Sequence, residues 1–180
     1  MEQQLKELEV KPNKMAFQVA LAFAIYTLAL IYLFKVLGID TQEENVSVST
    51  RVISSICSYV PFILGILYVQ NKHKEELGGY MTYGRGFSAG FRVSSYAGFF
   101  IGLLMILYYK VLDPEALNQL MEISIEKAGE DEKAIRAIKS TIPYMPFLVG
   151  FTGAITYTLL GLVISLVGAA FVKKERPLDS

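Results

Sequence analysis

The sequence predicts an all-α integral membrane protein, a four-helix bundle with an amphipathic helical hairpin in its third connection. Of its 180 residues, 53% are apolar and 19% carry a charge, and the mean hydropathy is +0.40. This composition is unusual for a water-soluble domain. Four stretches are apolar over roughly the 20 residues that a helix needs to cross a bilayer. We therefore expect residues 1–180 to form a single four-transmembrane domain.

Each apolar stretch is predicted to be a helix, because lipid offers no hydrogen-bond partner to a free backbone group. The first stretch is longer than the core of a signal peptide and is followed by a poor cleavage site, so we interpret it as a permanent helix. The predicted spans cover about residues 15–37, 52–69, 91–112 and 146–172.

The second span contains Pro61, which predicts a local bend. Proline has no N–H, so the helical hydrogen bond to the Cys57 carbonyl cannot form. Ser54 and Ser58 fall on one face of this helix. We expect their hydroxyl groups to help satisfy the backbone groups nearby.

The third connection, about residues 113–142, is predicted to be an amphipathic helical hairpin. Asp113 and Pro114 form a helix start, since an aspartate caps the first turn and a proline suits the first helical position. Gly129 is a typical helix stop, and a second short helix is expected to end at Pro143. Acidic residues outnumber basic ones here, so attraction to anionic lipid does not explain the hairpin. It either caps the outer ends of the bundle or serves as a docking surface for a partner.

Basic residues favour one orientation of the four spans. Lysines and arginines are more frequent in the N-terminal arm, the second connection and the C-terminal tail than in the other two connections. The first connection is acidic, with Asp40, Glu43 and Glu44. Because basic loops stay in the cytoplasm, both termini are predicted to be cytoplasmic.

The clearest pattern in the chain is a row of small residues at four-residue spacing along the third span, with a counterpart in the fourth. Small residues let two helix backbones approach closely in lipid, where hydrophobicity does not drive helices together. The row predicts close packing within the bundle, and the alternatives are a homodimer contact or a substrate groove. These helix-packing candidates are Gly86, Gly90, Ser94, Gly98, Gly102, Gly161 and Ser165.

A segment rich in glycine and aromatic residues precedes this row. Gly78 and Gly79 permit a turn, and the ring of Tyr83 suits a membrane boundary. Arg85 can reach lipid phosphate, and we expect Arg92 to extend its charged end to the same boundary. The sequence therefore predicts an interfacial segment.

Several function classes lack the residues that they need. No acidic residue lies inside a predicted span, and the one histidine, His73, stands in a charge run where we expect it to be solvated. Proton coupling, nucleophilic catalysis and metal binding are therefore disfavoured. The net charge is zero, which offers no field for nucleic acid, and a single cysteine excludes an intrachain disulfide. We expect no enzymatic activity, no cofactor and no metal.

Two hypotheses of different classes remain. The first is a scaffold, accessory subunit or envelope-interaction module, surrounded by membrane lipid and paired with a second copy or with another membrane protein. The alternative is a transporter component with a path between the second, third and fourth spans. A scaffold predicts a dry, tightly packed interior, whereas a transporter predicts a hydrated cavity. The polar lining of such a path would be Ser58, Tyr59, Tyr96 and Thr156.

Two motifs and the order of the four spans carry a family resemblance. The first motif is Gly78-Gly79-Tyr80-Met81-Thr82-Tyr83-Gly84-Arg85-Gly86-Phe87, followed by Gly90-Phe91, and the second is Tyr109-Lys110-Val111-Leu112-Asp113-Pro114-Glu115. With these, the chain resembles domain-of-unknown-function family 4199 of small bacterial inner-membrane proteins. The resemblance implies a four-span domain in the bacterial cytoplasmic membrane with a longer connection before the last span. It implies no reaction, ligand or functional residue.

Overall fold

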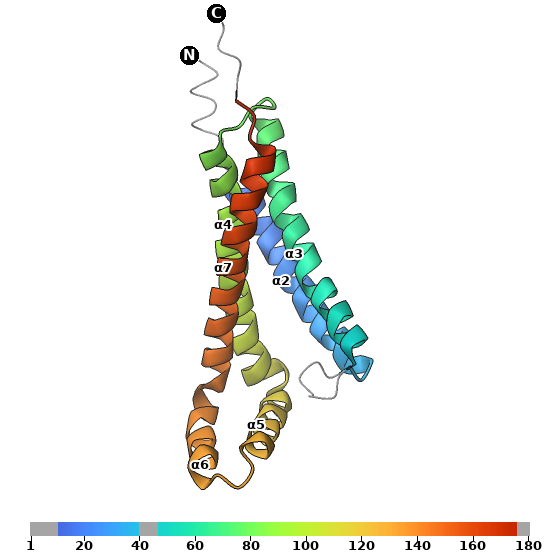
Figure 1. Ribbon diagram of the computed structural model, residues 1–180, viewed down its shortest axis with the longest axis vertical. Coiled ribbons are helices and arrows are strands. Elements are labelled where there is room, and N and C mark those ends of the chain that lie inside the picture. Colours follow the sequence, from blue (N-terminus) through green and yellow to red (C-terminus); the bar gives the residue numbers. More distant parts are fainter. Residues whose placement is uncertain (1–10, 40–46, 176–180) are drawn as a thin grey trace, which may run out of the picture. The chain divides into compact units, whose positions relative to one another are not determined.

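The computed structural model describes residues 11–39 and 47–175, and nearly all of them are helical (Figure 1). The predicted all-α class is confirmed, and the described residues contain no strand beyond a single β-bridge. The α-helices are α2 (Asn13–Val36), α3 (Val48–Glu76), α4 (Tyr83–Leu107), α5 (Pro114–Ala128), α6 (Glu132–Thr141) and α7 (Met145–Val172). A π-helix (Tyr108–Leu112) extends α4, and a 3-10 turn (Ile142–Tyr144) precedes α7.

Four helices are long and apolar enough to cross a membrane, as the sequence predicts. The largest difference concerns α3, which was expected over about residues 52–69 and runs from Val48 to Glu76. Its start is capped by the Ser47 side chain, which accepts a hydrogen bond from Thr50 N at 3.1 Å. At its end, an ion pair of 2.7 Å between Lys72 and Glu75 supports a polar helical turn.

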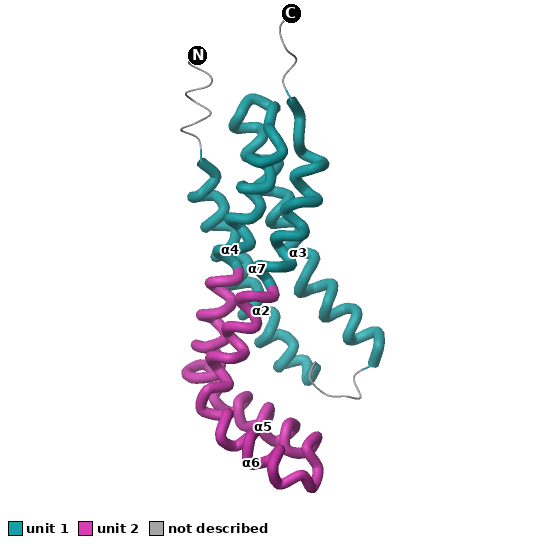
Figure 2. The backbone as a smooth tube through the Cα atoms, turned by 60° about the vertical axis from the view of Figure 1, so that its left-hand side comes forward, with its two compact units in different colours: residues 1–97, 157–180 teal, residues 98–156 magenta. Residues whose placement is uncertain are grey.

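The chain forms two compact units, coloured separately in Figure 2. The first contains residues 1–97 and 157–180, and therefore α2, α3, the first part of α4 and the last part of α7. The second contains residues 98–156, with the rest of α4, the beginning of α7, and the hairpin of α5 and α6.

In the second unit, the predicted hairpin is present with the expected caps. Asp113 Oδ1 accepts a hydrogen bond from Ala116 N at 3.3 Å, and Asp113 Oδ2 accepts one from the Tyr108 hydroxyl at 2.8 Å. Gly129 ends α5 with a φ of +58°, a left-handed conformation that favours glycine. Neither α5 nor α6 buries any residue fully, because their apolar sides are covered only in part. Whether the hairpin caps the bundle or docks a partner stays a prediction.

Candidate functional site

The first unit contains a buried amide, Gln70 of α3, that joins three helices. The Gln70 side chain is fully buried, and its Nε2 donates to the backbone oxygens of Gly86 in α4 at 3.0 Å and Ser165 in α7 at 2.9 Å. Both amide hydrogens are therefore used. One side chain of α3 holds the backbones of α4 and α7.

Glycines make room for this amide. A methyl group added at Gly90 would lie 2.7 Å from Gln70 Nε2 and 2.7 Å from Ser165 Oγ. A methyl group at Gly168 would collide with Gln70 Oε1. This oxygen makes no conventional hydrogen bond within the described residues and lies against the Gly168 backbone, where a weak Cα–H···O contact is available. We call the contact of α3 with α4 and α7 around this amide the Gln70 seam. It consists of Gln70, Gly86, Gly90, Ser165 and Gly168.

A second buried serine, Ser94 of α4, lies beside Ser165 and extends the seam. Ser94 Oγ donates to the Gly90 carbonyl at 3.1 Å, and Ser165 Oγ donates to the Gly161 carbonyl at 2.5 Å. The two hydroxyl oxygens are 3.5 Å apart. A methyl group at Gly161 would collide with the Ser94 side chain, so α4 and α7 touch here through small residues. The serine hydroxyls are occupied by helix carbonyls, and no histidine or acid of the described part of the chain is bonded to them.

Other members of the predicted packing row lie along the same two helices. A methyl group at Gly86 would lie 3.3 Å from the Ala169 Cβ in α7. In the second unit, a methyl group at Gly102 would lie 3.1 Å from the Gly150 carbonyl oxygen, a close approach of α4 to α7. Gly98 is buried. The four-residue spacing thus marks positions where the two backbones run close together.

The expectation that His73 is solvated is wrong. The residue is only 3% exposed. Its Nδ1 lies 3.6 Å from Glu76 Oε2, which is too long for a hydrogen bond, and finds no other partner within the described residues. Burial follows from helical spacing, because the apolar face of α3 continues from Ile66 to His73 and Leu77 through the charge run.

The predicted interfacial segment forms a turn and then enters α4. Gly78 and Gly79 have φ values of +80° and +86°, so both need the freedom of glycine. Met81 exchanges two backbone hydrogen bonds of 2.9 Å with Lys174, which ties the turn to the residues after α7. The Tyr83 hydroxyl donates to the Leu166 carbonyl at 3.3 Å. The placement of this segment at a membrane boundary stays a prediction.

The two arginines assigned to this segment, Arg85 and Arg92, lie on α4 and are half-buried.

The four residues predicted to line a polar path have different surroundings. Ser58 Oγ donates to the carbonyl of Ser54 in its own helix at 2.8 Å. The ring of Tyr59 lies 6.3 Å from that of Tyr157, and the ring of Tyr96 meets Phe17 edge-on at 5.7 Å.

The fourth residue of that proposed lining, Thr156, is exposed and belongs to the second unit. The path stays a prediction.

Of the Gln70 seam, sequence reasoning missed Gln70 and Gly168, and it did not find that His73 is buried. Gln70 and His73 follow the apolar part of α3 and stand in a run of polar residues, which is typical of a solvated helix end. The signal that points to them is spacing, because Phe62, Ile66 and Val69 precede them on the same buried face. Within the described residues, no three His, Cys, Asp or Glu side chains lie close enough together to hold a metal ion.

A comparison with protein-family models matches residues 18–174 to a family described as a protein of unknown function, DUF4199. No curated protein and no solved structure matches the chain. The matched range contains the Gln70 seam and the α5–α6 hairpin. Because it covers well over half of the sequence, the chain belongs to the DUF4199 family.

Proposed function

We propose that this protein is a non-enzymatic, multi-pass protein of the bacterial cytoplasmic membrane that acts as a scaffold or accessory subunit. The observation that carries the proposal is the Gln70 seam. Its amide N–H groups are bonded to two other helices, and Gly90 and Gly168 leave no free space beside it. Such a core holds helices in a fixed arrangement, which is what a scaffold requires. Its partners are membrane lipid and a second copy or another membrane protein.

A transporter needs a polar path that water or substrate can enter, and ionisable groups inside membranes often mark such paths. In this chain, the hydroxyl of Ser58 is bonded within its own helix, and the ring of Tyr59 lies beside Tyr157. At the centre of the first unit, Gln70 Nε2 is bonded to α4 and α7, and the Ser94 and Ser165 hydroxyls are bonded to carbonyls of their own helices. These contacts favour the scaffold over the transporter.

A dry seam is the first testable consequence. In a Cys57→Ala background, Ser94→Cys and Ser165→Cys should resist a membrane-impermeant maleimide from both sides of the membrane, because both positions are fully buried. Glu130→Cys, at an exposed position, is the matched control and should label completely. Labelling of Ser94→Cys in the folded protein would favour the transporter and contradict the scaffold.

We also propose that both termini face the cytoplasm. Lys72 and Lys74 end α3, and Lys173 and Lys174 follow α7, so basic residues gather at one end of the first unit. The charge argument also uses residues that lie outside the described part of the chain, among them the acids Asp40, Glu43 and Glu44.

The orientation is tested by labelling from one side at a time. In the Cys57→Ala background, Glu130→Cys should react with an impermeant reagent added to the periplasmic side, because the α5–α6 hairpin then lies outside. Lys74→Cys should react only from the cytoplasmic side. The reverse pattern would overturn the orientation and leave the dry seam unaffected.

A further inference from the structure

α3 runs without interruption through Pro61. Because proline has no N–H, the Cys57 carbonyl four residues earlier lacks its helical donor. In lipid, no water is available to replace that donor, and an unpaired carbonyl is costly. The Cys57 carbonyl therefore needs a donor from outside its own helix.

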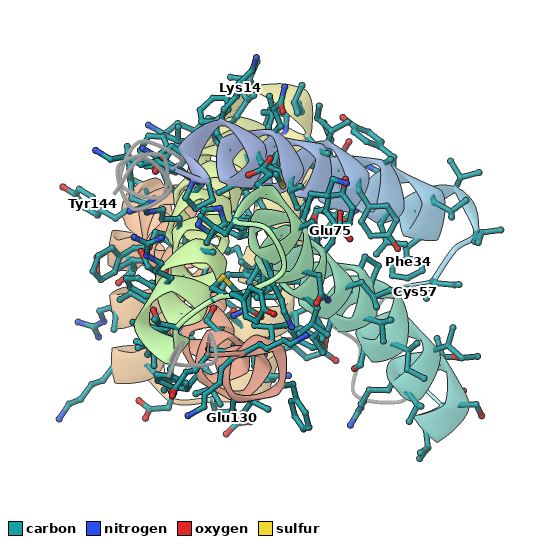
Figure 3. All side chains as sticks on the ribbon, turned by 90° about the horizontal axis from the view of Figure 1, so that it is seen from above. Lys14, Phe34, Cys57, Glu75, Glu130 and Tyr144 are labelled. Carbon is teal, nitrogen blue, oxygen red and sulfur yellow. The ribbon has the colours of Figure 1, made fainter. Side chains whose placement is uncertain are left out.

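Tyr26 of α2 supplies that donor. Its hydroxyl donates to the Cys57 carbonyl oxygen at 2.8 Å. Figure 3 shows Cys57 on the part of α3 that runs beside α2. Ser58, which the sequence suggested for this task, donates to the Ser54 carbonyl instead. A side chain on one helix thus replaces the hydrogen bond that proline removes from the next.

The two halves of α3 are held very differently. Before Pro61, α3 buries only Ser54, whereas after Pro61 the ring of Phe62 packs 5.1 Å from that of Phe23 and 5.2 Å from that of Tyr157. Regions with few buried contacts open more easily than regions with many. The remaining buried residues after Pro61 are Ile66, Val69, Gln70 and His73.

We call the part of α3 before Pro61 its outer half and the part after Pro61 its inner half. The outer half also contains side chains that favour bending. Ser55 Oγ donates to the Arg51 carbonyl at 2.9 Å, and Ser58 Oγ donates to the Ser54 carbonyl at 2.8 Å. A serine hydroxyl that bonds the carbonyl four residues earlier competes with the helical hydrogen bond and often bends the helix. Both serines lie within the turns just before Pro61.

We propose that Pro61 is a hinge in α3 and that Tyr26 is the latch that holds residues 48–60 in the orientation seen. When the hydrogen bond between Tyr26 and Cys57 breaks, the outer half of α3 tilts about Pro61. The inner half stays in place, because Gln70 ties it to α4 and α7. The latch lies on α2, so a change in the position of α2 controls the hinge. The hinge does not depend on the scaffold function.

The hinge is tested by measuring a distance along α3. Spin labels at Val52→Cys and Asn71→Cys, in a Cys57→Ala background, lie on exposed positions either side of Pro61. Their separation in a straight helix is about 29 Å. In reconstituted bilayers, double electron–electron resonance should give one narrow distribution for the protein with Tyr26. Tyr26→Phe should broaden the distribution and shift it to shorter distances.

A second substitution makes the test specific. Pro61→Ala restores an N–H that can bond the Cys57 carbonyl, so Tyr26→Phe combined with Pro61→Ala should give the narrow distribution again. Tyr68→Phe, in the part of α3 after Pro61, removes a hydroxyl that makes no hydrogen bond within the described residues, and it should change nothing. In thermal unfolding, the drop in melting temperature caused by Tyr26→Phe should be at least two-thirds smaller when Pro61→Ala is also present. A distribution that stays narrow in Tyr26→Phe, or stays broad in the double variant, would overturn the hinge.

Discussion

Replacing Gly161 with leucine is expected to destabilise the protein by about 3 kcal/mol, because α7 has no space for a side chain at this position. Even a Cβ atom there would collide with Ser94 of α4 and lie 2.9 Å from Phe62 Cζ of α3. For a chain of this size, such a loss lowers the melting temperature by about 6–12 °C. Thermal unfolding in detergent, followed by the fraction that remains monodisperse, measures the shift.

The matched control is Gly84→Leu, also in a long apolar helix. A Cβ atom at Gly84 meets nothing within 4 Å, so this substitution should change the melting temperature by less than about 2 °C. A size exchange tests the contact directly, since Ser94→Gly should recover most of the stability lost in Gly161→Ala. Equal melting temperatures for the Gly161 and Gly84 variants would mean that α4 and α7 do not approach closely.

Much of the fold was predictable because its signals are local. Four apolar stretches of sufficient length define the long helices, and Asp113, Pro114 and Gly129 mark the ends of α5 by capping chemistry that acts within a few residues. The helix ends were less predictable at α3. The helix extends into polar sequence at both ends, where hydropathy does not indicate a helix. The Ser47 cap supports its start, and the ion pair of Lys72 with Glu75 supports its end.

The seam was predictable only in part, because its central residue depends on distant partners. Spacing alone picked out the small residues Gly90 and Ser165. Gln70 bonds a carbonyl 16 residues away in α4 and another 95 residues away in α7, and nothing near it in the sequence indicates either partner. Gln70 stands at the start of a polar run that follows an apolar stretch, and such a run is typical of a solvated helix end.

The hydrogen-bond partner of the Cys57 carbonyl likewise could not be predicted from the sequence nearby. Pro61 indicates at once which carbonyl loses its donor, because that follows from helix geometry. The identity of the replacement donor does not follow, because Tyr26 is 31 residues away on another helix. Ser54 and Ser58 were the nearest candidates, but a serine reaches the carbonyl four residues before it rather than the one that proline leaves free.

Replacing Gly168 with alanine is expected to cost about 2 kcal/mol and to lower the melting temperature by about 4–8 °C. The new methyl group would collide with Gln70 Oε1 and lie 2.9 Å from Leu67 Cδ2. The amide cannot move aside without losing its bonds to Gly86 and Ser165, each worth roughly 0.6–1 kcal/mol. Gln70→Ala alone should also destabilise the protein, by about 2–3 kcal/mol, since it loses both bonds and leaves a cavity.

The combination of the two substitutions separates this explanation from a general intolerance of change in α7. Once Gln70→Ala has removed the amide, the methyl group at position 168 no longer meets Oε1. The remaining close contact, with Leu67 Cδ2, is with the end of a flexible side chain that can move into the space left by the amide. Alanine then favours the helix over glycine by up to about 1 kcal/mol, so Gly168→Ala should become neutral or stabilising in that background. A double-mutant cycle in detergent measures this change of sign. Additive losses would mean that the amide does not press on Gly168, and the contact between α3 and α7 at this point would have to be reassigned.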